Sequence, residues 1–328
     1  MKKRVAILGK TNLRAAQIED LGERCALTVY DDNVPIGSEE AVIERAEGAD
    51  LILINAFTPI TRHVVAELST VKTIVSCSSG IDHVDLEACG KSNIPVRWFP
   101  GYCARTVAEK TLSMILLGLN RTVEALRSSE EGRWDYLSFQ GREIPGRLVA
   151  VLGLGSTGRI VRDLCLAVGF DVEASNSKTP DDEVASLLAR ADVVTLHMAL
   201  TDRTRYFLDG PRLAHMRSDV CIVNTARGTL INEEALVAFL RENPVATALV
   251  DVLEREPPET DRPLRQLSNA AVTPHVGWNS AESDLYLAEQ THLALVTAID
   301  SGWATPEGET ATRLLAEEWP KPDRSVDS

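Results

Sequence analysis

The chain has 328 residues, of which 44% are hydrophobic and 25% charged, and its formal net charge is −14. This composition is typical of a globular protein long enough for two domains. The negative charge argues against nucleic acid or an anionic membrane surface as a partner, because both require clustered Lys and Arg. A local positive pocket remains compatible with a small anionic substrate.

The N-terminal segment and the cysteines predict a cytoplasmic protein. Residues 5–8 follow a basic start but are too few for the apolar part of a signal peptide, and no apolar run has the length of a membrane span. The cysteines show no CxxC pairing, so we expect buried free thiols. No two histidines have the spacing of a zinc site, so no metal is expected. The six cysteines are Cys25, Cys77, Cys89, Cys103, Cys165 and Cys221.

Short β-branched runs alternate with amphipathic ones along the first part of the chain, the pattern of a parallel α/β sheet. Strands are predicted at residues 5–8, 27–30, 51–55, 73–77 and 96–99. Helices are predicted at residues 39–47 and 61–68, followed by a long helix from residue 104 to about residue 126. The polar, glycine-containing stretch 128–146 is predicted to be a connection.

A second series of strands and helices begins at Leu148. Strands are predicted at residues 148–152, 171–175, 193–197, 220–224, 246–251 and 271–273. Helices are predicted at residues 156–168, 181–191, 232–242 and 282–301. The tail from residue 303 is rich in Glu, Pro and Asp and is predicted to be peripheral.

The GxGxxG segment at residues 153–158 lies between a predicted buried strand and a predicted helix. Glycines recur in many loops, so the motif alone is weak, but this context is that of a dinucleotide-binding βαβ unit. Gly153 would permit the tight turn, Gly155 a close approach to pyrophosphate, and Gly158 the packing of helix on strand. The segment therefore predicts a nicotinamide dinucleotide cofactor.

The strand after the glycine loop lacks an expected acidic residue. A site that prefers NAD usually ends this strand with Asp or Glu, which binds the ribose 2′-hydroxyl, whereas this chain has SNSK at residues 175–178. Asn176, Ser177 and Lys178 leave less reason to exclude a 2′-phosphate, so we expect NAD or NADP, with mixed use plausible. The alternative is that Lys178 points into solvent and that Glu173 or a backbone group binds the ribose.

Three residues in the second half carry the chemistry of a 2-oxo or 2-hydroxy acid. His275 could protonate a carbonyl oxygen, Glu256 could orient that imidazole and stabilise its charged form, and Arg227 could hold a carboxylate with its planar fork. Each residue taken alone is more often structural or solvated. All three, however, follow predicted strand ends, where ligands bind in open α/β sheets.

Four segments resemble signatures of the D-isomer-specific 2-hydroxyacid dehydrogenase family. They are LGLGSTGR at residues 152–159, VNTARG at 223–228, DVLEREP at 251–257 and TPHVG at 273–277. The likeness runs from about residue 45 to about residue 300, with the motifs in family order. It implies that Arg227 binds substrate, that Glu256 orients the histidine, and that His275 is the general acid and base.

The resemblance also implies the remaining site residues. Asp251 would hold the nicotinamide carboxamide, Thr106 would approach the nicotinamide, and the loop of Ser78, Ser79 and Gly80 would bind the substrate carboxylate. Trp278 is a candidate for the substrate pocket. Further cofactor contacts would come from Ser156, Thr157, His197, Ala226 and Gly277.

The family fold implies two domains with the active site in the cleft between them. Residues 1–99 and the C-terminal helix 286–328 would form a flavodoxin-like α/β substrate domain, and residues 100–285 a Rossmann doubly wound parallel sheet domain. A homodimer through the long helix after Pro100 is also implied. Ser79 replaces the lysine of the family's phosphite-oxidising branch, which disfavours phosphite but not an organic acid with a phosphonate group.

Two functions from different classes follow. The first is an oxidoreductase that transfers hydride between a nicotinamide cofactor and C2 of a small 2-hydroxy or 2-oxo acid, or a related phosphonate-bearing acid. The second is a dinucleotide-sensing, corepressor-like binding protein of the same fold, whose relatives retain the Arg, Glu and His. The ordinary length and the absence of long disordered extensions favour the enzyme. Glu256 argues against formate as the substrate.

Overall fold

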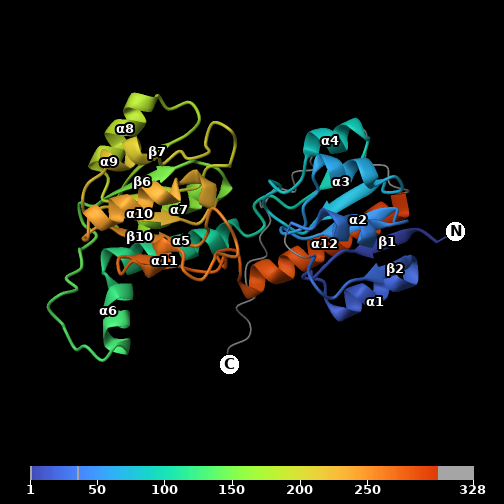
Figure 1. Ribbon diagram of the computed structural model, residues 1–328, viewed down its shortest axis with the longest axis horizontal. Helices are drawn as coiled ribbons and strands as arrows, with labels where there is room; N and C mark the ends of the chain where they lie inside the picture. Colours follow the sequence, from blue (N-terminus) through green and yellow to red (C-terminus); the bar gives the residue numbers. More distant parts are fainter. Residues whose placement is uncertain (1, 35–36, 302–328) are drawn as a thin grey trace. The chain divides into compact units, whose positions relative to one another are not determined.

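A computed structural model describes residues 2–34 and 37–301 (Figure 1). The chain divides into two compact units, of which the first comprises Met1–Tyr102 with Ser280–Ser328 and the second Cys103–Asn279. The tail from residue 303, and residues 302–328 of the expected C-terminal helix, lie outside the described residues. Each unit contains its own parallel sheet.

The first unit has five parallel strands in the order β2-β1-β3-β4-β5, which is the flavodoxin-like order. Its strands are β1 (Arg4–Ile7), β2 (Ala26–Val29), β3 (Leu51–Ile54), β4 (Thr73–Ser76) and β5 (Val96–Arg97). Its helices are α1 (Ala15–Arg24), α2 (Glu39–Ala46), α3 (Arg62–Glu67), α4 (Leu86–Lys91) and α12 (Ala281–Ser301). The central strands β3 and β4 are buried on both faces, as expected of a covered parallel sheet.

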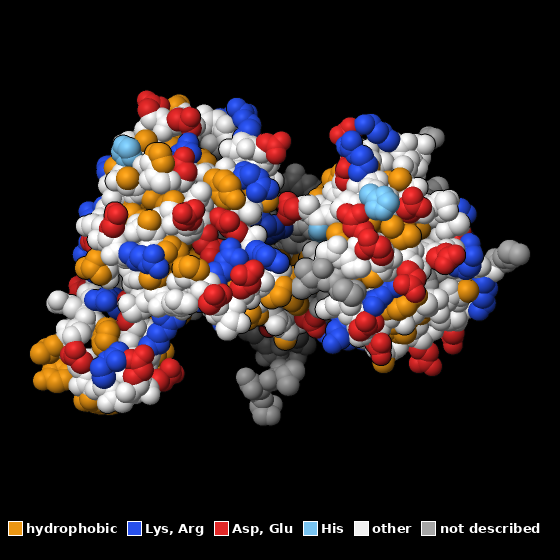
Figure 2. Space-filling view, viewed as in Figure 1, with side chains coloured by type: hydrophobic (Ala, Val, Ile, Leu, Met, Phe, Trp, Pro, Cys, Tyr) orange, Lys and Arg blue, Asp and Glu red, His pale blue; other side chains and the backbone are white. Residues whose placement is uncertain are grey.

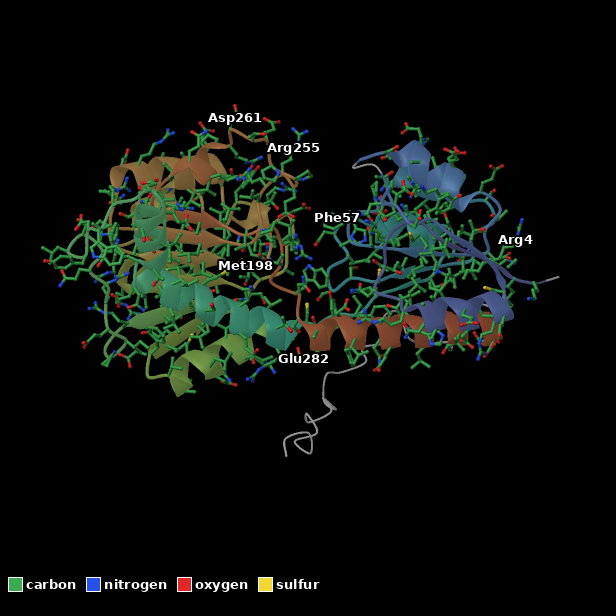
Figure 3. All side chains as sticks on the ribbon, turned by 90° about the horizontal axis from the view of Figure 1, so that it is seen from below. Arg4, Phe57, Met198, Arg255, Asp261 and Glu282 are labelled. Atoms are coloured by element: carbon green, nitrogen blue, oxygen red, sulfur yellow. The ribbon has the colours of Figure 1, made fainter. Side chains whose placement is uncertain are left out.

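Helices α1 and α12 lie side by side along the first unit although they are far apart in sequence (Figure 3). Asp284 of α12 accepts hydrogen bonds from Asn12 and Arg14, which precede α1. Nε2 of His292 lies 2.8 Å from a carboxylate oxygen of Asp20. These contacts fix the end of the described chain to its beginning within one unit.

The second unit has six parallel strands in the order β11-β10-β9-β8-β6-β7, so the predicted doubly wound α/β fold is confirmed. Its strands are β6 (Leu148–Leu152), β7 (Asp171–Ser175), β8 (Val193–Leu196), β9 (Cys221–Asn224), β10 (Thr247–Val250) and β11 (Ala270–Val272). Its helices are α5 (Ala104–Leu119), α6 (Thr122–Glu130), α7 (Ser156–Ala167), α8 (Asp181–Arg190), α9 (Gly210–Ala214), the 3₁₀ helix η1 (Gly228–Leu230), α10 (Glu233–Glu242) and α11 (Pro263–Gln266).

The prediction of one long helix from residue 104 to about residue 126 is wrong. Helix α5 ends at Leu119, and a separate helix, α6, begins at Thr122. Arg121 adopts a left-handed backbone with φ of 50°, a conformation that a continuing right-handed helix excludes. The backbone N–H of Arg142 donates a 3.0 Å hydrogen bond to the Leu119 carbonyl, which caps the end of α5. The predicted connection at residues 128–146 is also partly wrong, since α6 includes its first three residues.

Helix α5 packs tightly on the second sheet, which requires the small residue Gly118. A Cβ at Gly118 would lie 2.5 Å from the sulfur of Cys221 and 2.6 Å from a methyl carbon of Leu249. All six cysteines are buried and none forms a disulfide bond, so the prediction of buried thiols outside disulfides is confirmed. In the part of the chain that the structure describes, no helix combines the length and the apolar composition needed to cross a bilayer.

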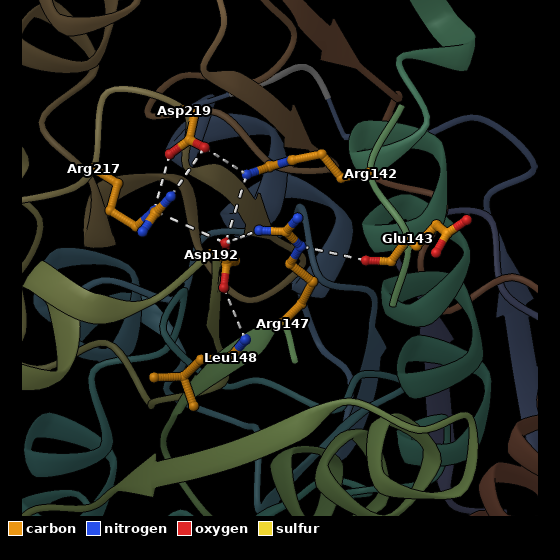
Figure 4. A network of polar contacts seen from close by, with 7 residues as sticks. All are labelled: Arg142, Glu143, Arg147, Leu148, Asp192, Arg217 and Asp219. Carbon is orange, nitrogen blue, oxygen red and sulfur yellow. Dashed lines mark hydrogen bonds and ion pairs between the residues drawn. The ribbon is translucent and has the colours of Figure 1, made fainter. Parts of the chain in front are cut away.

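An ion-pair network around Asp192 fixes the amino ends of β6, β8 and β9 (Figure 4). Asp192 accepts hydrogen bonds from the Leu148 N–H at 3.0 Å and from Arg147 at 3.1 Å. Arg142 and Arg217 bridge from Asp192 to Asp219. The network ties the polar connection to the edge of the sheet opposite the glycine loop, leaving the carboxyl edge for ligands.

Candidate active site

The predicted functional residues of the second unit follow the carboxyl ends of neighbouring strands. The chain passes from β6 to the edge strand β7 and then to β8 on the other side of β6, so the strand order reverses between β6 and β8. Ligands of open α/β sheets bind at such a switch point. The glycine loop follows β6, His197 follows β8, Arg227 follows β9, Asp251 and Glu256 follow β10, and His275 follows β11.

The glycine loop has the shape that a dinucleotide requires. Gly153 has φ of 104°, and its Cβ would lie 2.7 Å from the backbone nitrogen of Met198. A Cβ at Gly158 would lie 1.9 Å from the Gly153 carbonyl oxygen, so only glycine lets α7 begin this close to the strand. A Cβ at the exposed Gly155 would meet nothing within 4 Å, which leaves its backbone accessible to pyrophosphate.

Ser156 and Thr157 form the first turn of α7, where backbone N–H groups favour an anion. This part of the second unit therefore fits a dinucleotide phosphate group, and Gly153, Gly155, Ser156, Thr157 and Gly158 would hold it.

His197 lies beside the glycine loop in its neutral form. A Cβ at Gly158 would be 3.2 Å from the His197 Cβ, and the His197 Nε2 lies 2.9 Å from the Thr195 hydroxyl. Although part of the residue reaches solvent, burial of the ring lowers the pKa of His197 from 6.5 to about 3. The imidazole is therefore uncharged near neutral pH.

The buried imidazole of His197 should make the protein less stable in acid. The unfolded chain binds a proton near pH 6.5 but the folded chain only near pH 3, so the free energy of unfolding falls as pH decreases between these values. We expect His197→Gln to have a shallower acid dependence of Tm than the wild type. The exposed control His63→Gln should keep the wild-type slope, and an unchanged slope for His197→Gln would contradict the argument.

The end of β7 leaves the predicted ribose-binding position without an available carboxylate. Glu173 accepts two hydrogen bonds from Arg190, at 2.9 and 2.8 Å, and is therefore occupied by an ion pair. The Asn176 side-chain oxygen accepts the Lys178 backbone N–H at 2.8 Å, which closes a turn of the Asx type. Asn176, Ser177 and Lys178 are all exposed.

The structure places Glu256 and His275 in direct contact, and the positive charge of Arg227 acts on Glu256. His275 Nδ1 lies 2.6 Å from Glu256 Oε2, and the other carboxylate oxygen accepts the Leu253 N–H at 2.8 Å. The side chains of His275 and Glu256 are 34% and 24% exposed, so the imidazole can reach a substrate. Because Nδ1 is taken by Glu256, Nε2 is the atom available for proton exchange.

Glu256 is ionised at neutral pH. Burial raises the pKa of this carboxyl. The hydrogen bond and charge of His275, the Leu253 N–H and the positive charge of Arg227 lower it by a larger amount, so the net pKa is below the usual 4.5. A negative charge therefore faces the imidazole throughout the neutral range.

The loop that bears Arg227 is fixed by two small structural devices. The buried Asn224 donates to the Arg227 carbonyl at 2.8 Å and accepts the Ala226 N–H at 3.0 Å. A Cβ at Gly228 would lie 1.9 Å from the carbonyl carbon of Leu253, so only glycine allows this loop to contact the segment leading to Glu256. Sequence reasoning missed Gly228, although it ends the VNTARG signature.

The predicted carboxylate-binding loop belongs to the first unit and has its own internal hydrogen bonds. The hydroxyls of Ser76 and Ser78 lie 2.7 Å apart, and Ser78 donates to the Gly80 carbonyl at 2.7 Å. Ser79 accepts the Gly101 N–H at 3.2 Å.

Thr106, in the first turns of α5, and Trp278 are half-buried residues of the second unit.

Asp251 and Gly277 are buried together in the second unit, where Asp251 accepts the Gly277 N–H at 2.6 Å. Sequence reasoning also missed Thr273, whose hydroxyl donates to Asp251 at 2.5 Å. The position of Thr273 in the TPHVG signature was a usable signal. Across residues 2–34 and 37–301, no group of three or more His, Cys, Asp or Glu side chains is arranged to hold a metal ion.

Comparison with known proteins gives the same family for sequence and structure. A model of the NAD binding domain of D-isomer specific 2-hydroxyacid dehydrogenases matches residues 112–277. D-3-phosphoglycerate dehydrogenase of Methanocaldococcus jannaschii is 33% identical over 75% of this chain and 49% of its own length, so the chain spans about half of that relative. Hydroxypyruvate reductase of Thermotoga maritima is 31% identical over 71% of this chain and 79% of its own length. A glyoxylate reductase structure from Paecilomyes thermophila has a TM-score of 0.81 at 26% identity, covering 92% of this chain and 96% of that one.

Proposed function

Because the chain belongs to the D-isomer specific 2-hydroxyacid dehydrogenase family, we propose that it catalyses hydride transfer between a nicotinamide dinucleotide and C2 of a small 2-hydroxy or 2-oxo acid. The observation that carries the proposal is the 2.6 Å contact of His275 with Glu256, on a loop edge that also holds Arg227 and the dinucleotide-binding glycines. When bound, the nicotinamide would supply or accept the hydride.

The residues have distinct roles in this reaction. In the reducing direction, His275 Nε2 donates a proton to the substrate carbonyl oxygen, and in the oxidising direction it accepts the hydroxyl proton. Glu256 keeps the ring oriented and stabilises its charged form. The guanidinium of Arg227 holds the substrate carboxylate, with two donors in one plane. The family resemblance implies that Ser78, Ser79 and Gly80 bind a substrate carboxylate, and Trp278 is a candidate for the substrate pocket.

A panel of acids tests the reaction. Glyoxylate, hydroxypyruvate, pyruvate and phosphonopyruvate should be offered with NADH and with NADPH, and 3-phosphoglycerate in the oxidising direction. We expect at least one 2-oxo acid to consume reduced cofactor with saturation kinetics, measured by the absorbance of the reduced nicotinamide. Dinucleotide binding without turnover of any of these acids would favour the sensing protein instead.

The end of β7 supports weak discrimination between the two cofactors. Asn176 closes a turn and Glu173 is paired with Arg190, so a 2′-hydroxyl meets no carboxylate, whereas Lys178 can attract a 2′-phosphate. A charge-assisted hydrogen bond contributes about 1.5–3 kcal/mol. We therefore expect Asn176→Asp to shift the ratio of kcat/KM for NADH and NADPH towards NADH by about tenfold or more.

The matched control for this prediction is Asp182→Asn, which changes an exposed carboxylate in the first turn of α8. This variant should leave the cofactor ratio unchanged. A wild type with strong NADH preference, unmoved by Asn176→Asp, would contradict the prediction.

The exposed apolar residues around α6 support the homodimer implied by the family. Leu126, Trp134, Tyr136 and Leu137 form what we call the α6 patch, and their side chains are between 58% and 87% exposed. Figure 2 shows apolar side chains gathered at this end of the second unit. Large exposed apolar residues of this kind mark protein interfaces. Helix α6 overlaps the end of the long helix that the family resemblance places at the dimer interface, so we place the interface at the α6 patch.

The mass of the protein in solution tests this interface. We expect the wild type to sediment as a dimer and the double variant Trp134→Ser with Tyr136→Ser to shift towards monomer in analytical ultracentrifugation. The control Phe57→Ser, which changes an exposed aromatic residue of the first unit, should remain dimeric. A monomeric wild type at micromolar concentration would overturn the proposed interface.

A further inference from the structure

The buried carboxylate of Asp251 accepts three hydrogen bonds from the segment that carries His275. Oδ1 accepts the Thr273 hydroxyl at 2.5 Å and the Val276 N–H at 2.9 Å, and Oδ2 accepts the Gly277 N–H at 2.6 Å. The residue is 2% exposed. Because these donors come from both sides of His275, the carboxylate determines the shape of the intervening backbone.

The backbone at His275 has the left-handed conformation, with φ of 52°. This conformation is unfavourable for a residue with a side chain and persists only where the surroundings impose it. The His275 N–H donates to the Asp251 carbonyl at 2.9 Å, so both the backbone and the side chain of Asp251 hold the turn. This backbone turn directs the imidazole towards Glu256.

The fit of this segment against Asp251 leaves little freedom. A Cβ at Gly277 would lie 2.7 Å from Asp251 Oδ2, so the chain approaches the carboxylate as closely as a glycine permits. On the other side of His275, the Thr273 N–H continues the sheet by donating to the Val250 carbonyl at 3.0 Å. The Thr273 hydroxyl is the side-chain donor of the three, so a substitution can remove it while the two backbone donors, the Val276 and Gly277 N–H groups, remain in the chain.

We propose that Thr273, acting through Asp251, is a positioning residue that holds His275 in its left-handed turn and so maintains the contact between the imidazole and Glu256. This inference rests on the proposed function. It gives Asp251 a task beyond the nicotinamide contact that the family resemblance implies, because its oxygens already accept three donors from the histidine segment. Without the hydroxyl, the segment relaxes towards extended backbone and the imidazole moves away from Glu256.

The test replaces the hydroxyl by a methyl group of similar size. Thr273→Val should lower kcat for the best 2-oxo acid by about 10–100-fold, with little change in the dinucleotide Kd measured by fluorescence. Thr273→Ser, which restores the donor, should recover most of the lost activity. Thr291→Val, an isosteric change in a buried threonine of α12, is the control and should keep wild-type kcat.

A second readout separates positioning from general stability. In the wild type, reductive kcat should decrease as the pH rises. Thr273→Val should shift this decrease to lower pH, as Glu256→Gln should, because both variants weaken stabilisation of the protonated imidazole. In the background of His275→Ala, Thr273→Val should change the residual rate by less than about twofold, since the residue through which it acts is gone. If Thr273→Val does not fold, Thr273→Ala removes the same donor and carries the same expectations.

The outcomes distinguish this inference from the proposed function. Wild-type kcat in His275→Ala would overturn the function, and the inference with it. A strong loss in His275→Ala together with wild-type kcat and pH profile in Thr273→Val would overturn the inference alone. Full, additive loss in the double variant would also overturn it, by showing that Thr273 acts independently of His275.

Discussion

Replacing His275 by alanine should lower kcat for reduction of the preferred 2-oxo acid by about 10²–10⁴-fold, the usual contribution of a positioned general acid. The imidazole is partly exposed and bound through Nδ1 to Glu256, so Nε2 is the proton donor that the variant loses. The glycine loop is a separate segment of the second unit, and we therefore expect the dinucleotide Kd to stay close to the wild-type value. Single-turnover kinetics together with a fluorescence titration measure the two quantities.

His215→Ala is the matched control, because this exposed histidine lies on α9's C-terminal side in the same unit. It should keep wild-type kcat. A His275→Ala variant with near-wild-type kcat on its best substrate would remove His275 from the catalytic role. An equal loss of dinucleotide affinity and kcat would instead indicate a folding defect.

Glu256→Gln tests the electrostatic part of the same arrangement. The pKa of Glu256 lies below 4.5, so the wild-type carboxylate stays charged at and above that pH. Glutamine keeps the shape but removes the charge, and the protonated imidazole is then less stable. Reduction needs the protonated ring, so reductive kcat decreases as the pH rises. In the variant this decrease should begin at a lower pH than in the wild type.

The α/β fold and the positions of the site residues could be predicted from the sequence because their signals are local. Buried parallel strands are short β-branched runs, and β6 and β7 begin and end at the predicted residues 148–152 and 171–175. In such a sheet, residues that follow successive strands meet at one edge. This rule predicts that Arg227, Glu256 and His275 lie at the same edge.

The errors arise where distant contacts decide the structure. Residues 104–126 have a continuous helical pattern. The helix nevertheless ends at Leu119, where the Arg142 N–H binds the Leu119 carbonyl and the backbone of Arg121 is left-handed. The local sequence pattern does not predict either feature. The sequence pattern does not indicate helix α1 or the short helices α4, α9 and α11. Helix α4 has only six residues and depends on the Asp85 side chain, which accepts the Ala88 N–H at its start.

The internal hydrogen bonds of the site also depend on distant residues. Motif order places Asp251 near the histidine, but it does not show that both carboxylate oxygens bind the backbone around His275. Motif order also does not show that Gly228 lies against the backbone of Leu253. Such contacts between loops of different strands become visible only in three dimensions. Replacing Gly228 should change kcat/KM by an amount large enough to measure.

Gly228→Ala should lower kcat/KM by about 10²-fold, because a misplacement of about 1 Å in a catalytic group has an effect of this size. The added Cβ would lie 1.9 Å from the Leu253 carbonyl carbon, 2.0 Å from its oxygen and 2.4 Å from the Glu254 nitrogen. These are backbone atoms and cannot rotate away as a flexible side chain would. The loop with Arg227 and the segment with Glu256 must therefore separate.

Gly210→Ala provides a control with the same chemical change, because its Cβ would make only an ordinary 4.0 Å contact with Ala235. It should keep wild-type kcat/KM. Thermal unfolding and dinucleotide titration of Gly228→Ala then show whether the lost activity comes from displaced loops or from an unfolded chain, since the glycine loop after β6 should still bind cofactor. Wild-type kcat/KM in a folded Gly228→Ala variant would show that catalysis tolerates separation of the two loops, and would weaken the assignment of Arg227 and Glu256 to one site.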